Sequence, residues 1–274
     1  MIRSNKPARS NWLAPLTVVL ILFLWLGFLE QRELFHPDEG RYAEIPREMV
    51  VSGDWITPRL NGLKYFEKPV LQYWATAVAY RMFGVDEWTA RLWTAMCGLF
   101  TLVLAYLTAR RLSNVNAARV ASLALASSFQ FLAFGQILTL DMGVTCFLTL
   151  ALAGWFGALD ERLTPGARRK WALAMWAAMG LAVLSKGLIG VVLPGLVLAA
   201  HLAATRTLAP LRELDWRLGT LVLLAVVLPW FVAVQWINPE FSAFFFVHEH
   251  FDRFARADHH RPGPWYFFPA SGCT

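Results

Sequence analysis

Long runs of apolar residues dominate this sequence. Seven of them approach or reach the roughly 17–25 residues that an α-helix needs to cross a bilayer. They lie at 12–29, 92–109, 117–134, 142–159, 171–184, 187–203 and 218–237. The run at 171–184 is short, so its helix is expected to extend beyond these limits. The pattern predicts an all-α integral membrane protein, a multi-spanning helical bundle.

The composition supports lipid as the solvent of this chain. Hydrophobic residues make up 57% of it and charged residues 16%, whereas a soluble domain carries about 25% charged residues. The three cysteines are too scattered for a disulfide framework, and Cys97 and Cys146 are predicted to lie in the core. The net charge of +6 comes from basic residues between apolar runs. Nucleic-acid binding is therefore not expected, and the sequence contains no glycine-rich phosphate loop.

The loop charges predict the orientation of the chain. The N-terminal tail and the short segments after the second, fourth and sixth runs hold more than half of the 25 basic residues. The positive-inside rule places these segments in the cytoplasm. The outer, periplasmic face then receives the long loop 30–91, the link 135–141, Lys186 and the segment from 238 onward. Polar chemistry is therefore expected on the outer face.

Paired acids open an amphipathic stretch in the first outer loop. Asp38 and Glu39 follow Pro37, and Arg41 lies three residues after Asp38. Acids after a proline are typical of a helix N-terminus, where capping and the helix dipole favour them. Alternatively, an unpaired carboxylate that faces lipid head groups would repel anionic lipids unless it acted as a base. Arg41 could then hold a phosphate.

A second candidate segment follows in the same loop. Asn61 and Gly62 form a turn signal, and Pro69 is expected to open a helix over 70–83 that is re-entrant or lies along the membrane interface. Between them, Glu67 and Lys68 are either an ordinary solvated pair or a metal ligand beside a phosphate-binding cation.

Further candidates lie outside the first loop. Asp141 opens the fourth run, where a dipole role and a functional role are equally compatible with the sequence. A charge in the tight turn at Lys186 is costly unless it is bound or reaches the interface. His248 and His250 could form a metal site, but alternating residues of a helix point apart, so one of the two is the expected ligand.

The motifs together resemble the polyprenyl-phosphate-sugar glycosyltransferases, a family with the multi-spanning GT-C fold that includes protein O-mannosyltransferases. The run 35–42, FHPDEGRY, resembles the first-loop signature of that family. The run 65–74, YFEKPVLQYW, is similar to the bacterial branch that includes the transferase of 4-amino-4-deoxy-L-arabinose from undecaprenyl phosphate to lipid A. Residues 140–141, 185–187 and 246–254 match in order and spacing.

The resemblance implies a role for each matching position. Asp38 is the implied catalytic carboxylate, and Asp141 is the second carboxylate candidate. Glu67 and His248 are the implied ligands of a divalent metal, for which zinc suits an oxygen and a nitrogen ligand and manganese or magnesium are alternatives. The positions implied to bind substrate are Arg41, Tyr42, Tyr65, Lys68, Lys186 and Arg253. A cation or metal can stabilise the departing phosphate while a carboxylate takes the acceptor proton.

The expected protein is a bacterial inner-membrane glycosyltransferase with interfacial helices in the first outer loop. Residues 1–274 are expected to form a single transmembrane domain, with 30–91 as a large periplasmic loop and 238–274 as a periplasmic segment. The implied partners are a polyprenyl-phosphate-sugar donor and lipid A or another glycolipid acceptor. Family members continue with more spans and an outer domain, so the chain is expected to be truncated.

Three rival interpretations stay open at this point. A protein O-mannosyltransferase-like enzyme would use serine or threonine acceptors. A membrane transporter would need charged residues or broken helices at mid-membrane. A non-catalytic fragment would need neither.

Overall fold

A helix forms in each of the seven apolar runs. The structure, a computed structural model, describes residues 13–35 and 37–245. Its membrane-run helices are α1 (Leu13–Leu26), α4 (Glu87–Leu112), α5 (Val115–Ser127), α6 (Phe129–Gln136), α7 (Asp141–Leu159), α8 (Pro165–Lys186), α9 (Ile189–Thr205) and α10 (Trp216–Ile237), with a 3-10 helix, η1 (Ala209–Leu214), before α10. The fifth run extends on both sides, as expected, because α8 has 22 residues.

Three of these helices, α4, α7 and α10, are long and apolar enough to cross a membrane by themselves. The third run is broken, since α5 and α6 meet at Ser128 with a bend of 64° and count as a fourth span only when taken together. The remaining helices fall short for two reasons. α1 and α9 have 14 and 17 described residues, and α8 carries charges at both ends. The count of seven spans stays a prediction.

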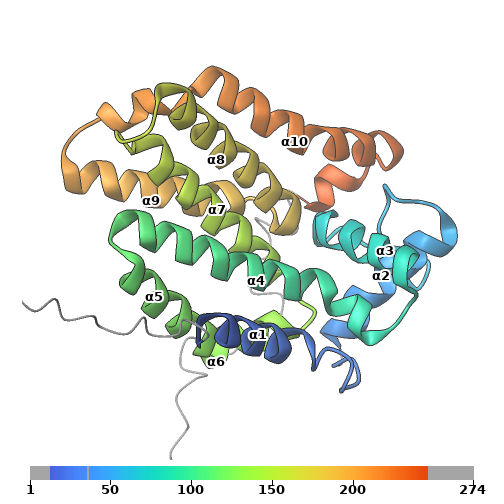
Figure 1. Cartoon of the computed structure of the whole chain (residues 1–274). Helices are drawn as coiled ribbons and strands as arrows, with labels where there is room; N and C mark the ends of the chain where they lie inside the picture. The colour runs from blue at the N-terminus through green and yellow to red at the C-terminus, as the bar shows by residue number, and fades with distance from the viewer. Residues whose placement is uncertain (1–12, 36, 246–274) are drawn as a thin grey trace, which may run out of the picture.

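The bundle is centred on α7, which packs against α4 and α8, while α8 also packs against α10 and α9 (Figure 1). The basic segments between the helices gather at one end of the bundle. There Arg111 Nε lies 3.2 Å from Asp160 Oδ2, and Arg169 Nε lies 2.6 Å from Asp215 Oδ2. We call this the basic end. The loops expected on one side of a membrane therefore do lie together.

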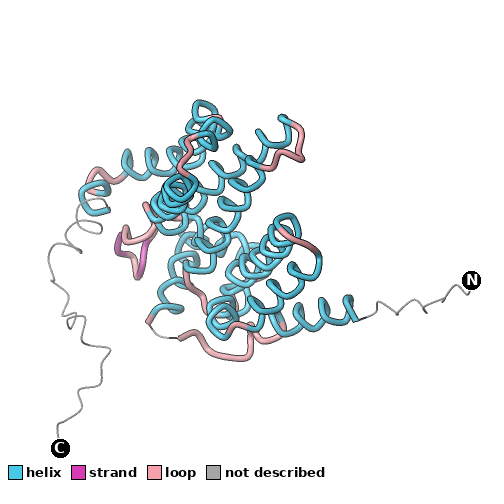
Figure 2. Tube along the Cα trace, turned by 90° about the vertical axis from the view of Figure 1, so that its left-hand side faces the viewer, coloured by secondary structure: helices cyan, strands magenta, loops and turns pink. Residues whose placement is uncertain are grey.

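The first loop folds into two helices and a hairpin at the opposite end. α2 (Asp38–Ser52) begins directly after Pro37, and α3 (Leu71–Phe83) confirms the helix expected at 70–83. Between them, β1 (Arg59–Leu60) pairs antiparallel with β2 (Leu63–Lys64), the strands of the described chain (Figure 2). Asn61 and Gly62 have φ angles of 54° and 78°, as a two-residue hairpin turn requires. The expected turn is confirmed.

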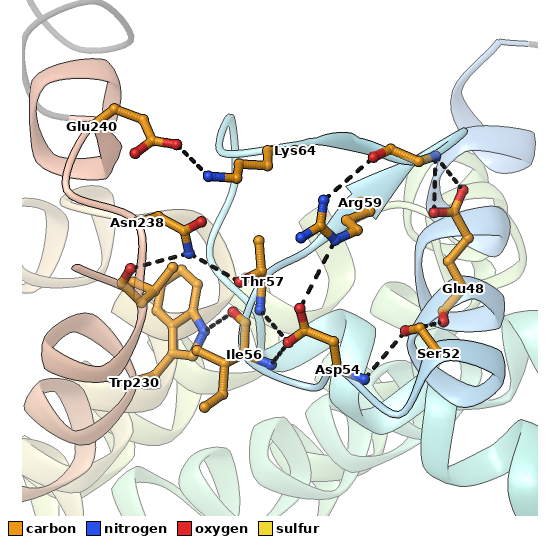
Figure 3. Close-up of polar contacts among 12 residues, drawn as sticks. Glu48, Ser52, Asp54, Ile56, Thr57, Arg59, Lys64, Trp230, Asn238 and Glu240 are labelled. Carbon is orange, nitrogen blue, oxygen red and sulfur yellow. Dashed lines mark hydrogen bonds and ion pairs between the residues drawn. The ribbon is translucent and has the colours of Figure 1, made fainter. Parts of the chain in front are cut away.

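The first loop is tied to the end of α10. Lys64 Nζ lies 2.6 Å from Glu240 Oε1, and Asn238 Nδ2 donates to Thr57 Oγ1 at 2.9 Å (Figure 3). The indole Nε1 of Trp230 donates to the carbonyl of Ile56 at 3.0 Å. The described residues of loop 30–91 and residues 238–245 therefore share one end of the bundle, as the loop charges predicted.

The Trp25 indole docks α1 onto the bundle. Trp25 is 1% exposed, and its Nε1 donates to the carbonyl of Ala95 in α4 at 2.9 Å. Its ring lies so close to Gly98 and Gly135 that a methyl group at either glycine would overlap it. Other described side chains of α1 are exposed on the bundle surface, as expected for residues that face lipid: Val19, Leu20, Leu22 and Phe23. Shape complementarity at Trp25 thus helps to position α1, and Ile21 packs against the same apolar cluster.

Candidate active site

α2 presents three of the predicted site residues on one face. Asp38, Arg41 and Tyr42 are spaced three and four residues apart, so their side chains lie over one another on a helix. Arg41 Nη2 forms an ion pair with Asp38 Oδ1. The premise of an unpaired Asp38 was therefore wrong. The Asp38 side chain is nevertheless 59% exposed, so it is open to a substrate.

Arg41 lies at the centre of a polar cluster made with the segment after β2. Its Nη1 lies 3.7 Å from Glu67 Oε2, and its guanidinium lies over the rings of Tyr42 and Tyr65, at 5.2 Å and 5.8 Å from their centroids. The hydroxyl of Tyr65 donates to Glu67 Oε2 at 2.9 Å. Burial and the nearby Glu67 carboxylate raise the pKa of Tyr65, so this phenol stays protonated and keeps donating. One cation is thus held between two carboxylates and two aromatic faces.

The first residue of α7 and the last residue of α8 complete the cluster. Lys186 Nζ forms an ion pair with Asp141 Oδ1. The link between this pair and the Arg41 group is electrostatic, because the Asp141 carboxylate acts on Tyr42. Burial raises the pKa of Tyr42, and the carboxylates of Asp38, Glu67 and Asp141 raise it further, while Arg41 lowers it. We call this set, Asp38, Arg41, Tyr42, Tyr65, Glu67, Asp141 and Lys186, the Arg41 cluster.

The predicted site residues divide into three groups. Seven form the Arg41 cluster, and they come from four separate parts of the sequence. Lys68 is half-buried and adjacent to Glu67 in the chain. His248 and Arg253 lie outside the described residues.

The placement of Asp141 and Lys186 fits both a helix-dipole role and a functional role. Each sits at the helix end whose dipole favours its charge, Asp141 in the first turn and Lys186 in the last. Their ion pair also leaves Asp141 within electrostatic range of Tyr42. A structural and a functional role are therefore compatible at these two positions.

α3 carries two buried polar side chains, Tyr73 and Gln72, whose burial was not predicted. The Tyr73 ring lies 6.3 Å from the Tyr42 ring and is fully buried. Its hydroxyl, and Oε1 of the adjacent Gln72, have no hydrogen-bond partner among the described residues. Buried polar atoms without partners are rare, because each costs free energy. The burial of these two side chains was not predicted, because a helix over 70–83 at the membrane interface is not expected to bury polar side chains.

Glu39 has a structural role, which corrects its interpretation as one of two acids facing the head groups. Its side chain is fully buried and accepts from Arg91 Nε at 2.9 Å and from Arg32 Nη1 at 2.8 Å. The backbone amides of Leu138 and Phe35 donate to the same carboxylate at 2.7 Å and 2.9 Å. Arg91, also fully buried, donates in turn to the carbonyls of Leu29, Arg32 and Glu33.

The electrostatics of Glu39 follow from these contacts. Burial by itself raises the pKa of this carboxyl, but the hydrogen bonds from Arg91, Leu138, Phe35 and Arg32 outweigh burial and lower the pKa to about 2. Helical spacing does not separate the two acids. The buried face of α2 comprises Glu39, Tyr42, Ala43, Ile45, Pro46 and Met49. Asp38, four residues before Tyr42 and seven before Ile45, falls at the same helical period, so the contacts of Glu39 with Arg91 and Arg32 are what distinguish it.

The metal site is incomplete within the described residues. No three His, Cys, Asp or Glu side chains gather there in a way that could hold a metal ion. Glu67 supplies a single carboxylate, which already faces Tyr65 and Arg41. An oxygen and a nitrogen ligand would suit zinc, but the predicted nitrogen ligand, His248, is not described.

The Arg41 cluster can in principle serve a group transfer from a phosphate. Arg41 and Lys186 offer cationic donors, and a guanidinium can grip a phosphate with two hydrogen bonds. Asp38 lies next to Arg41 with more than half of its side chain exposed. An exposed carboxylate can accept a proton from an attacking hydroxyl. Positive charge for a departing phosphate and a base thus occur side by side.

Comparison with known families decides where the chain belongs. The family model of the dolichyl-phosphate-mannose-protein mannosyltransferases matches residues 10–245. The chain is a member of the dolichyl-phosphate-mannose-protein mannosyltransferase family. As such a member, with several apolar helices, it is a multi-pass integral membrane protein, and the predicted family and fold class are confirmed.

Individual relatives of this mannosyltransferase-family chain are bacterial. It is 34% identical over 267 residues to undecaprenyl phosphate-alpha-4-amino-4-deoxy-L-arabinose arabinosyl transferase 2 of Pseudomonas fluorescens, covering 97% of the chain and 45% of the relative. The undecaprenyl phosphate-alpha-4-amino-4-deoxy-L-arabinose arabinosyl transferase of Aeromonas hydrophila is 34% identical over 265 residues, covering 95% of the chain and 47% of the relative. The chain spans about half the length of the curated relatives it matches.

Two solved structures share the fold. ArnT from Cupriavidus metallidurans bound to undecaprenyl phosphate is 44% identical with a TM-score of 0.87, covering 89% of the chain and 45% of ArnT. The apo state of the same ArnT is 43% identical, also with a TM-score of 0.87, covering 90% and 46%.

Proposed function

We propose that the chain is part of a membrane glycosyltransferase that moves 4-amino-4-deoxy-L-arabinose, or a similar sugar, from undecaprenyl phosphate to lipid A or a related glycolipid. The observation that carries this proposal is the Arg41 cluster, in which cations and an exposed carboxylate lie together in a fold that also binds undecaprenyl phosphate in ArnT. The names of the relatives supply the sugar.

Each residue of the cluster has a proposed role. Asp38 takes the proton of the acceptor hydroxyl as that hydroxyl attacks the anomeric carbon, with Asp141 as the second candidate base. Arg41, Lys186 and Lys68 hold the lipid phosphate and stabilise its charge as it departs. The proposed lining residues of the phosphate site are Tyr42 and Tyr65, together with Arg253.

Transfer of labelled sugar tests the proposal. Membranes that contain the chain are supplied with undecaprenyl phosphate carrying radiolabelled 4-amino-4-deoxy-L-arabinose and with lipid A. Label is expected in lipid A, and not in membranes without the chain. Absence of transfer to any lipid acceptor would contradict the proposal.

A second acceptor class is favoured by one observation. The family model that matches the chain is that of the dolichyl-phosphate-mannose-protein mannosyltransferases. The acceptors of those enzymes are proteins. The same assay separates the two candidates, because label in exported polypeptides rather than in lipid A would identify the protein-modifying activity.

We propose that the Arg41 cluster faces the periplasm from the inner membrane. The support is that the basic segments gather at the other end of the bundle, and basic loops favour the cytoplasm. In a Cys273→Ser background, an impermeant thiol reagent added to spheroplasts is expected to label Ser52→Cys but not Glu161→Cys. Both positions are exposed, and they lie toward opposite ends of the bundle. The reverse labelling pattern would overturn this orientation.

We propose further that Glu67 and His248 bind a divalent metal, preferably zinc. The support is the carboxylate of Glu67 at the edge of the Arg41 cluster. Purified protein is expected to retain about one metal ion per chain and to lose it to a chelator. Because imidazole must be neutral to bind, retention should fall below about pH 6.

Metal content, measured by elemental analysis, checks this prediction independently of activity. Glu67→Ala should abolish retention, whereas Glu240→Ala, which removes another exposed carboxylate at the same end of the bundle, should not. Equal metal content in both variants would exclude Glu67 as a ligand.

A further inference from the structure

A cleft opens between α4, α7 and α8 at the basic end, far along the bundle from the Arg41 cluster. Its volume is about 380 Å³, and its wall is apolar, formed by side chains that include Leu104, Leu107 and Phe156. Arg110, Arg111 and Trp171 also line it. A neighbouring opening of about 420 Å³ shares Arg111 and Phe156. The cleft thus combines a hydrocarbon-lined trough with cations at the end of a spanning helix.

The two arginines of the cleft are held differently. Arg111 is fixed, because its Nε lies 3.2 Å from Asp160 Oδ2 and its guanidinium lies 5.2 Å from the centroid of the Trp171 ring. Arg110 is exposed, and across residues 13–35 and 37–245 no hydrogen bond or ion pair engages its side chain. Cations in a last helical turn do complement the helix dipole. That effect explains neither the apolar trough nor the indole beside the pair.

The charge around the cleft favours an anion. Arg110, Arg111 and Arg162 line the two openings against the carboxylates of Asp160 and Glu161. Asp160 is already shared between Arg111 and Arg162, at 3.2 Å and 2.8 Å. Glu161 lines only the neighbouring opening, so the unpaired charge in the trough itself, among the described residues, is that of Arg110.

We propose that this cleft is a binding site for an anionic phospholipid, with an acyl chain along Leu104, Leu107 and Phe156 and the phosphate on Arg110. Tryptophan is typical of the membrane–water boundary, so Trp171 places the rim at head-group depth. Basic pockets between transmembrane helices on the cytoplasmic side bind anionic head groups, and the guanidinium forks of arginine match phosphate oxygens. A soluble phosphate would leave the apolar trough unused, which is why the occupant is a lipid.

Native mass spectrometry of the detergent-solubilised chain tests this site. Dioleoyl phosphatidylglycerol is titrated against dioleoyl phosphatidylcholine, which has the same acyl chains and no net charge. The chain is expected to prefer phosphatidylglycerol, and Arg110→Gln to lower that affinity about fivefold, the effect of one basic residue near a charged lipid. Dihexanoyl phosphatidylglycerol and inorganic phosphate should bind more weakly than the long-chain lipid, because they cannot fill the trough.

Arg119→Gln is the matched control. Arg119 is an exposed arginine on α5 that lines neither opening, so its substitution should leave lipid affinity unchanged. Equal loss in both variants would show that the lipid responds to overall charge rather than to the cleft and would overturn the proposal. So would an unchanged affinity in Arg110→Gln, or phosphate binding as tight as that of the lipid. Because Arg110 makes none of the described contacts that hold the bundle, its substitution should not unfold the chain.

Discussion

Replacing Asp38 by asparagine is expected to lower sugar transfer by about 10²–10⁴-fold, the usual effect of losing a general base. Asparagine has nearly the same shape and can still accept at a helix N-terminus, so α2 should form. The lost ion pair with Arg41 is at the surface, and such pairs contribute about 0–1 kcal/mol to stability. The expected result is a folded protein with little transfer, measured as labelled lipid A per unit of chain in the membrane.

Glu44→Gln is a close control for that experiment. Glu44 and Arg47 form a second ion pair on α2 with the same i,i+3 spacing as Asp38 and Arg41, but they lie outside the Arg41 cluster. Transfer by this variant should match the unsubstituted chain. If Asp38→Asn folded normally and kept more than about a tenth of the transfer, Asp38 would have a structural role in the first turn of α2 rather than a catalytic one. The base would then have to be sought at Asp141.

Replacing Glu39 by alanine is expected to destabilise the fold by about 3–5 kcal/mol, because it leaves the buried charge of Arg91 without its partner. The substitution also leaves the backbone amides of Leu138 and Phe35 without their hydrogen-bond acceptor. Glu240→Ala removes an exposed carboxylate from its pair with Lys64 and should cost about 0–1 kcal/mol. Equilibrium denaturation in detergent measures both. Equal stability of the two variants would refute the structural role of Glu39.

The structural role of Glu39 should also appear in the pH dependence of the free energy of unfolding. The folded pKa of Glu39 is about 2, below its ordinary value of 4.5. A lowered folded pKa means that the carboxylate stabilises the fold fully above about pH 4.5, and that this contribution is lost as the pH falls toward 2. Glu39→Gln, which cannot ionise, should show a smaller loss of stability over that window than the unsubstituted chain.

Local patterns in the sequence predicted the elements of the fold but not their partners. The apolar runs located the helices, because a span must be continuous in apolar character. Asn61 and Gly62 located the hairpin, because few residues adopt positive φ. The bend between α5 and α6 at Ser128 was not predicted, because the run 117–134 is apolar on both sides of it and contains no proline.

The candidate site was predicted as a list of residues rather than as a set of contacts. The separate roles of Asp38 and Glu39 could not be assigned from their positions alone, since the partner of Glu39 is Arg91, 52 residues away. The pairing of Lys186 with Asp141, 45 residues apart, likewise depends on how α7 packs against α8. Burial and pairing are properties of the packed bundle, and those properties distinguish a base from a structural acid.

The docking of α1 through Trp25 constrains how this family can vary. Since a methyl group at Gly98 or Gly135 would overlap the indole, a larger residue at either position is tolerated only if position 25 shrinks with it. The lipid-facing residues of α1, such as Val19 and Phe23, carry no such restriction. Among relatives, positions 25, 98 and 135, far apart in the chain, should therefore change together, while exposed positions such as Val19 and Leu20 vary independently of them.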